Sequence, residues 1–234
     1  MTYERAVENS VALFAAAKLA GVQRIVHTSI ANPSTDSPFG YYRGKAHVER
    51  ALEDLGLPYS ILRPTVLFGK EDILINNIAW LVRHSPIFLV AGDGNYRLQP
   101  IAVDDYAALM KQHGAMHNDS VIRDAVGAET YSFIDLVALI KDQLCSKTKI
   151  VRVSPRLFYL SSLLAGWFVR DRIVTWDEVR GLMGNLLVSE EAPLGRTSFR
   201  AWLDKNADSI GIKYHSEVLR HYQNRGVERD NLGE

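Results

Sequence analysis

The N-terminal part of the sequence alternates between helical and strand-forming segments, and this alternation limits the folds open to the chain. Apolar residues recur with helical spacing from Glu4 to Leu19. A short β-branched run follows at Arg24–Ile30, a second helix is predicted at Tyr41–Leu55, and a second strand ends at Pro64. Helix, strand, helix, strand at this spacing requires crossover connections. The sequence therefore predicts an α/β fold with a parallel sheet.

Strand signals continue to about residue 153 and then stop. The remaining chain is predicted to be helical, at Arg156–Val169, Thr175–Leu187, Ser198–Leu203 and Tyr214–Tyr222. Thr175 and Glu178 match the Thr-x-x-Glu capping box, which marks a helix start. We therefore expect two domains, an α/β domain at residues 1–153 and a helical C-terminal lobe at residues 154–234.

Composition excludes several classes of protein. The chain has 27 basic and 27 acidic residues, so no excess charge supports binding to nucleic acid. The single cysteine, Cys145, excludes a disulfide framework, and His27 and His47 lack partners at metal-ligand spacing, so no metal site is predicted. No signal peptide is evident, and the most apolar run, Leu157–Val169, is too short to span a bilayer. We expect a cytoplasmic protein without a transmembrane segment.

Tyr41 and Lys45 form the first candidate for chemistry. They are four residues apart in a predicted helix, so their side chains leave the same face. A lysine ammonium near a tyrosine hydroxyl favours the phenolate and lowers the tyrosine pKa, which suits general acid–base work. The spacing taken without context favours an ordinary solvated helix face. Tyr42, three residues before Lys45, is a rival for the same role.

Polar residues at the ends of the predicted strands favour a catalytic role for Tyr41 and Lys45 over an ordinary solvated helix face. Ser29 ends the first strand, where a hydroxyl would hold a substrate carbonyl or alcohol; its alternative is to satisfy a turn, and Thr28 is a rival. Pro64 and Thr65 end the next strand. Because the carboxyl ends of parallel strands line the ligand site of an open sheet, these groups are expected at one edge.

The segments GVQRIVHTSI, Tyr41-x-x-x-Lys45, LPYSILRPTVLFG and IAVDDYA resemble the extended or atypical short-chain dehydrogenase/reductases, the NAD-dependent epimerase/dehydratase superfamily. EDILINNIAWLVRHSPIFLV and GDGNYRLQPIAVDD are similar to the branch around the nucleotide-binding accessory subunit of respiratory complex I. The resemblance implies a doubly wound, Rossmann-type parallel sheet in residues 1–153, with substrate-lobe insertions, that binds NAD or NADP.

The resemblance also implies roles for individual residues. Ser29 would hold the substrate, Tyr41 would be the acid/base, and Lys45 would contact the nicotinamide ribose. Pro64 and Thr65 would lie against the nicotinamide, and Asn9 matches an asparagine of the first helix, with a solvated polar position as its alternative. Asp104 or Asp105 is expected to cap a helix rather than to contact substrate.

The sequence departs from this family in one respect. It contains no Gly-x-x-Gly-x-x-Gly turn, the element that lets the backbone approach the cofactor pyrophosphate, and Gly92-x-Gly94 has no third glycine. Either a fragment of a longer protein or a form that has lost cofactor binding explains this; the fragment is our expectation. The sheet would then be incomplete, and the first helix would expose apolar surface.

Two functions follow as hypotheses. The first is an NAD(P)-dependent reductase or epimerase-like protein that transfers hydride at the carbonyl or alcohol carbon of a small-molecule substrate. The second is a non-catalytic NAD(P)-binding scaffold or accessory subunit. In that case Trp167, Trp176 and Trp202 of the helical tail would dock a partner protein or a membrane surface, with packing of the lobe as their alternative.

Overall fold

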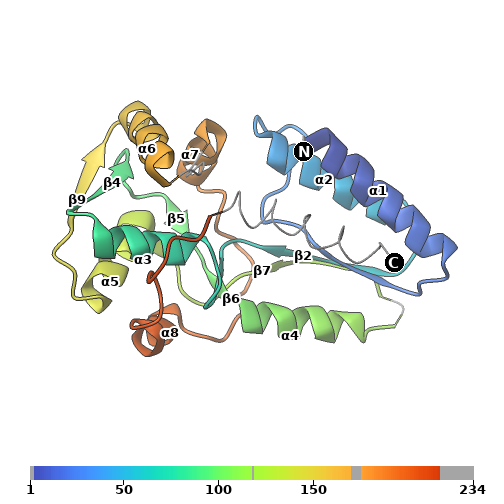
Figure 1. Cartoon of the computed structure of the whole chain (residues 1–234). Coiled ribbons are helices and arrows are strands. Elements are labelled where there is room, and N and C mark those ends of the chain that lie inside the picture. The colour runs from blue at the N-terminus through green and yellow to red at the C-terminus, as the bar shows by residue number, and fades with distance from the viewer. Residues whose placement is uncertain (1–2, 118, 170–174, 217–234) are drawn as a thin grey trace, which may run out of the picture. The chain divides into compact units, whose positions relative to one another are not determined.

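A computed structural model describes residues 3–117, 119–169 and 175–216 (Figure 1). The helices are α1 (Tyr3–Leu19), α2 (Gly40–Glu53), α3 (Leu74–His84), α4 (Val103–Gly114), α5 (Phe133–Gln143), α6 (Pro155–Val169), α7 (Trp176–Met183) and α8 (Phe199–Asn206). The strands are β1 (Ile25–Thr28), β2 (Tyr59–Pro64), β3 (Leu67–Phe68), β4 (Ile87–Ala91), β5 (Arg97–Leu98), β6 (Ile101–Ala102), β7 (Val121–Ala125), β8 (Tyr131–Ser132) and β9 (Lys149–Val153).

The chain forms two compact units, each assembled from three separate segments. The first unit consists of Met1–Gly69, Arg97–Tyr131 and Asn185–Ala201. The second consists of Lys70–Tyr96, Ser132–Gly184 and Trp202–Glu234. The chain thus passes repeatedly between the units, and the domain division predicted at residues 153 and 154 stays a prediction.

The first unit is built around a parallel sheet with strand order β1–β2–β7. Helices α1 and α2 lie alongside each other and pack on one face, where Phe14, Leu52 and Ile61 form a buried cluster (Figure 1). Helix α4 covers the opposite face, where Leu62 and Tyr106 belong to a second cluster. Both faces are therefore covered by helices, as a parallel sheet requires. The predicted α/β, Rossmann-type fold is confirmed.

Helix α1 buries little of its apolar surface. It ends at Leu19, and Gly21 follows with a φ of 77°, the left-handed conformation that glycine adopts after helix ends. Phe14 is its buried residue, whereas Leu13 and Leu19 are 66% and 90% exposed. Strand β1 is an edge of the described sheet, pairing with β2 on one side. The exposure of apolar side chains on this helix agrees with the sequence expectation.

The second unit contains the parallel pair β4–β9, with α3 packed against α5 and α6 packed against β4 and α7. The capping box of α7 is confirmed, because Thr175 Oγ1 accepts from Glu178 N and the Glu178 carboxylate accepts from Thr175 N. Helix α7 ends at Met183 rather than at the predicted Leu187. Asn185 adopts a left-handed φ of 54°, which interrupts the helix, and Leu187 forms a bridge with Leu98 instead.

Helix α6 exposes a row of leucines. Leu157, Leu160 and Leu164 are each more than half exposed and recur at helical spacing. Trp176 packs edge-to-face on Tyr159 of α6, at 5.6 Å between ring centroids, which agrees with the packing alternative for this tryptophan. The side chain of Trp167 and residues 217–234, with most of the predicted helix at Tyr214–Tyr222, lie outside the described residues. No helix in the described ranges has the length and apolarity that a bilayer crossing needs.

Candidate active site at the carboxyl end of the parallel sheet

Polar side chains gather where the strands of the β1–β2–β7 sheet end. Thr28 of β1 pairs with Leu62 of β2, which pairs with Arg123 of β7. One residue further on, Ser29 N donates to Leu62 O at 2.8 Å, and Arg63 pairs with Asp124. The register therefore brings Ser29, Arg63 and Asp124 to the same level of the sheet. Side chains at one level of neighbouring strands share a face.

The hydroxyl of Ser29 is buried and has no hydrogen-bond partner among the described residues. Ser29 is 3% exposed, and its Oγ is one of two such buried side-chain atoms. The rival hydroxyl of Thr28 accepts from Tyr106 OH at 2.9 Å and faces Met110 on the α4 side. A buried hydroxyl without a partner in the protein is costly unless a water or a ligand satisfies it. Ser29 thus differs from Thr28, whose hydroxyl is engaged with α4, and its role as the substrate-binding hydroxyl stays a prediction.

Helix α2 brings Lys45 to the end of β1. Lys45 Nζ donates to Thr28 O at 2.9 Å, one residue before Ser29. The same ammonium lies 5.9 Å from the centroid of the Tyr41 ring, within the range of a cation–π contact. Burial lowers the pKa of Lys45, and the neighbouring Glu49 carboxylate opposes this. The structure thus places Lys45 close both to Tyr41 and to the residue before Ser29, and the roles of the three residues stay predictions.

The two neighbouring tyrosines of α2 differ in access. Tyr41 is 42% exposed and packs against the rings of Tyr3 and Tyr42. Tyr42 is buried against Phe39, and burial followed by the nearby Tyr41 raises its pKa to about 12. Burial, followed by Tyr3, also raises the pKa of Tyr41. The expected lowering of the Tyr41 pKa by Lys45 is absent in this structure, because desolvation outweighs an ammonium that lies over the ring.

The structure gives less direct evidence for the other three predicted cofactor contacts, which are Pro64, Thr65 and Asn9. Pro64 ends β2, and its carbonyl accepts from Ala31 N at 3.0 Å, so it stands beside the segment that follows Ser29. The Thr65 hydroxyl donates to Gln99 O and is therefore engaged within the protein. Asn9 is exposed on α1, which packs against α2. The roles assigned to Pro64, Thr65 and Asn9 stay predictions.

A buried ion pair connects α2 to β2 beside these groups. Arg63 Nε donates to Glu49 Oε1 at 3.0 Å and Arg63 Nη2 to Glu49 Oε2 at 2.5 Å, while Glu49 is 3% exposed. His27 faces the same side and packs edge-to-face on Phe14, with Nε2 buried and unpartnered among the described residues. Burial and, to a smaller extent, the Lys45 charge lower the pKa of His27 to about 4, whereas the Glu49 carboxylate acts in the opposite direction. The ring is therefore neutral at physiological pH.

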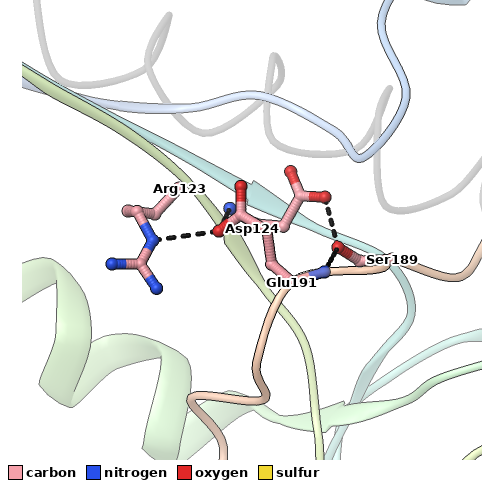
Figure 2. A network of polar contacts seen from close by, with 4 residues as sticks. All are labelled: Arg123, Asp124, Ser189 and Glu191. Carbon is pink, nitrogen blue, oxygen red and sulfur yellow. Dashed lines mark hydrogen bonds and ion pairs between the residues drawn. The ribbon is translucent and has the colours of Figure 1, made fainter.

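A second polar network ties the segment Asn185–Ala201 to the end of β7 (Figure 2). Arg123 Nε donates to Glu191 Oε2 at 2.9 Å, and Asp124 N donates to the same oxygen at 3.3 Å. Ser189 Oγ donates to Asp124 Oδ2 at 2.5 Å and accepts from Glu191 N at 3.0 Å. The Arg123–Glu191 pair is 41% exposed on both sides, so its contribution to stability is small.

Sequence reasoning missed Glu49, Arg63 and His27, and it misplaced the role of Asp105. Glu49 is the next position of the Tyr41–Lys45 face, and the i, i+4, i+8 spacing was a usable signal for it. Ser189 and Glu191 are remote in sequence and carry no such signal. Asp105 does not cap α4: its Oδ2 accepts from Arg196 N and Thr197 N at 2.7 Å, because the segment at residues 185–201 passes close to it.

No protein-family model matches the chain. Several curated proteins are similar to the chain in sequence. The chain is 23% identical over 185 residues to "NADH dehydrogenase [ubiquinone] 1 alpha subcomplex subunit 9, mitochondrial" of Arabidopsis thaliana, covering 74% of this chain and 45% of that protein. The Mus musculus protein of the same name is 31% identical over 122 residues, covering 52% and 30%. The chain thus spans less than half the length of these relatives.

Solved structures with similar folds include reductases complexed with dinucleotides. The Citrobacter sp. triphenylmethane reductase complexed with NADP(H) has a TM-score of 0.71 at 17% identity, covering 88% of this chain and 72% of that one. The Escherichia coli NADPH-dependent quinone oxidoreductase complexed with NADPH has a TM-score of 0.65 at 20% identity, covering 85% and 69%. The resemblance to the extended short-chain dehydrogenase/reductases is confirmed. These structural likenesses, each below 25% identity, show the fold alone.

Proposed function

We propose that the chain carries the proton-transfer site of an NAD(P)-dependent reductase or epimerase-like protein that acts on a carbonyl or alcohol carbon. The observation that carries this proposal is the Ser29 hydroxyl, buried without a partner at the end of β1 and one residue from the carbonyl that holds Lys45. Sequence similarity to the complex I subunit and fold similarity to NADPH-bound reductases support the dinucleotide.

Each of the three residues has a distinct task in this proposal. Ser29 donates its hydroxyl hydrogen to the substrate oxygen and fixes the carbonyl carbon in place. A bound nicotinamide supplies the hydride. Tyr41, whose hydroxyl is protonated at neutral pH as tyrosine ordinarily is, gives its proton to the oxygen as negative charge develops there. Lys45 stabilises the phenolate that remains, and solvent returns the proton to the 42% exposed ring.

The residues present fit one half of the cofactor. Lys45 uses one hydrogen of its ammonium on Thr28 O, which leaves two for ribose hydroxyls. Pro64 stands beside the segment after Ser29, where a flat ring would lie. For the pyrophosphate, this sequence offers no glycine triplet. Within the chain, binding therefore rests on the nicotinamide–ribose end, and we expect its affinity to be low.

Cofactor binding is the first test. We expect saturable changes in NADPH or NADH fluorescence on titration with the protein, and weaker binding by about tenfold or more in Lys45→Met, since a charged hydrogen-bond donor is lost. An absence of saturable binding by the wild-type protein, or an unchanged affinity in Lys45→Met, would overturn the assignment of Lys45.

Turnover is the second test, with a quinone, a triphenylmethane dye and a UDP-sugar as substrates. Tyr41→Phe should lower turnover by about 10²- to 10⁴-fold while cofactor binding is nearly unchanged, since it removes the general acid. Tyr42→Phe is the matched control, because it removes the neighbouring hydroxyl from the same helix, and it should keep turnover. Equal activity of Tyr41→Phe and the wild type would remove Tyr41 from the mechanism.

The second candidate is a non-catalytic NAD(P)-binding accessory subunit, and two observations favour it. The curated relatives are named as subunits of NADH dehydrogenase. The exposed leucines of α6 offer the helical lobe an apolar face for a partner protein or a membrane surface. Cofactor binding without turnover on any substrate would identify this function. Those relatives are named mitochondrial, and the cytoplasmic location expected from the sequence remains our proposal.

A further inference from the structure

A shallow depression of about 520 Å³ lies in the second unit, where α3 ends and β9 begins. Its lining is cationic and hydroxylated, without a carboxylate: Arg83, His84, Ser85, Pro86, Ile87, Ser146, Lys147, Thr148 and Lys149. The basic groups come from two chain segments that are distant in sequence. Only the tertiary structure brings them together.

The positive charges of this depression are not neutralised by the described part of the protein. The ion pairs found there are Arg63–Glu49, Arg123–Glu191 and Lys141–Asp142, none of which involves a lining residue. Lys147 and Lys149 are exposed and flank the buried Thr148. Like charges gathered without a counter-charge raise the local concentration of anions.

The polar groups that would repel an anion are already satisfied. The last carbonyls of α3 would carry the negative end of the helix dipole into the depression. Thr148 Oγ1 donates to Val82 O and lies 2.7 Å from Ser85 O, and Ser146 Oγ also donates to Val82 O at 2.7 Å. Arg83 donates to two carbonyls that follow α8, Ile210 O at 3.1 Å and Ala207 O at 2.6 Å.

Further hydrogen bonds hold the backbone that carries the two lysines in place. Lys149 N donates to Pro86 O at 2.9 Å, which starts the pairing of β9 with β4, and Thr148 N donates to Ser146 Oγ at 3.2 Å. The loop that carries Lys147 and Lys149 is therefore fixed on the end of α3 before any ligand arrives. A backbone that is already ordered loses less entropy on binding than a mobile one.

We propose that this depression binds a phosphate-bearing ligand through Lys147 and Lys149, with Arg83 contributing charge. Two ammonium groups supply up to six hydrogen-bond donors to phosphate oxygens. Pro86 and the half-exposed Ile87 add apolar surface for the part of the ligand that carries the phosphate. The ligand is either a soluble phosphate compound or the phosphate of a lipid headgroup. This site is independent of Ser29, Tyr41 and Lys45.

Calorimetric titration with inorganic pyrophosphate at low ionic strength tests the site. The wild-type protein should bind saturably, and Lys147→Gln/Lys149→Gln should bind about tenfold or more weakly. Lys141→Gln is the matched control, because it removes a positive charge from the same unit outside the depression; its affinity should stay within about twofold of the wild type. Ser29→Ala should bind pyrophosphate as the wild type does, which separates this site from the proposed active site.

A second arm uses phosphatidylcholine vesicles with and without phosphatidic acid. Sedimentation of the wild type with the acidic vesicles, lost in the double variant, supports a lipid headgroup as the source of the phosphate. Pyrophosphate binding without vesicle binding supports a soluble ligand. The proposal is overturned if the wild type binds neither probe saturably, or if the double variant binds as the wild type does, or if Lys141→Gln weakens binding as much as the double variant.

Discussion

The two units use charge in opposite ways. In the first unit, Glu49 and Arg63 are largely buried and hold each other, and the polar atoms of Ser29 and His27 are enclosed without partners among the described residues. In the second unit, Lys147 and Lys149 are exposed, and the hydroxyls beside them are satisfied by backbone carbonyls. Burying the polar groups of the first unit costs folding free energy. Keeping the lysines of the second unit exposed costs little, and their charges stay available to bind a ligand.

This difference separates stability from binding. A buried charge whose partner is removed destabilises the protein whatever the ligand, while an exposed lysine affects a bound anion and little else. Substitutions that remove a partner of a buried charge in the first unit should therefore change the free energy of unfolding, and substitutions of the exposed lysines at the depression should not. The four predictions below test this contrast.

Glu49→Ala should have the largest effect. It leaves the half-buried Arg63 without its counter-charge, and we expect a loss of about 3 kcal/mol in the free energy of unfolding. Chemical denaturation measures it. Glu53→Ala is the matched control, since it removes an exposed carboxylate from the last turn of the same helix and should change stability by less than about 0.5 kcal/mol. Similar losses of stability in both variants would show that the Glu49–Arg63 ion pair stabilises the fold no more than an exposed carboxylate does.

Acidification should destabilise the first unit through His27. In the folded protein the pKa of His27 is about 4, below its ordinary value of 6.5. Between these two pH values His27 is protonated in the unfolded chain and neutral in the folded chain, so stability falls as the pH falls through this range. After allowance for partial solvent screening, we expect a loss of about 1 to 2 kcal/mol in stability over this window. Denaturation at several pH values should show a shallower dependence in His27→Phe. Identical slopes in both proteins would contradict a neutral buried His27.

Ser29→Ala should uncouple stability from function. Removing a buried hydroxyl that lacks a partner relieves its desolvation cost, so we expect the free energy of unfolding to stay level or rise by about 1 kcal/mol. Any turnover should fall in the same variant. Thr28→Ser, which keeps the hydroxyl bonded to Tyr106, is the comparison. A clear loss of stability in Ser29→Ala would mean that Ser29 has a structural partner.

Lys147→Gln should have the smallest effect on stability. The side chain is exposed and takes part in none of the described ion pairs, so we expect a change within about 0.5 kcal/mol by denaturation. Phosphate binding should nevertheless weaken. A loss of stability comparable with that of Glu49→Ala would abolish the contrast between the two units.

Much of the candidate site could be predicted because its signals are local. Tyr41 and Lys45 share a helix face by spacing, and Ser29 and Pro64 follow strands whose β-branched composition is plain. The choice between Ser29 and Thr28 was not accessible, because it depends on which face of the sheet each hydroxyl meets. Thr28 meets Tyr106 of α4, and Ser29 lies on the face of α2.

Local periodicity, then, determined the helices and the parallel strands, because these follow from side chains a few residues apart. The family resemblance came from particular segments of the sequence that are similar to known proteins. Tertiary structure decided the polar partners. Arg63 and Glu49 are 14 residues apart, Ser189 and Asp124 are 65 apart, and Thr148 reaches Val82 across 66 residues. The Arg63–Glu49 pair depends on the packing of α2 on β2 within one continuous segment of the first unit. The other two pairs each join segments that the other unit separates in sequence, and no sequence spacing encodes that path. Burial made those contacts strong, because enclosed charges and hydroxyls must find partners within the protein or in a ligand.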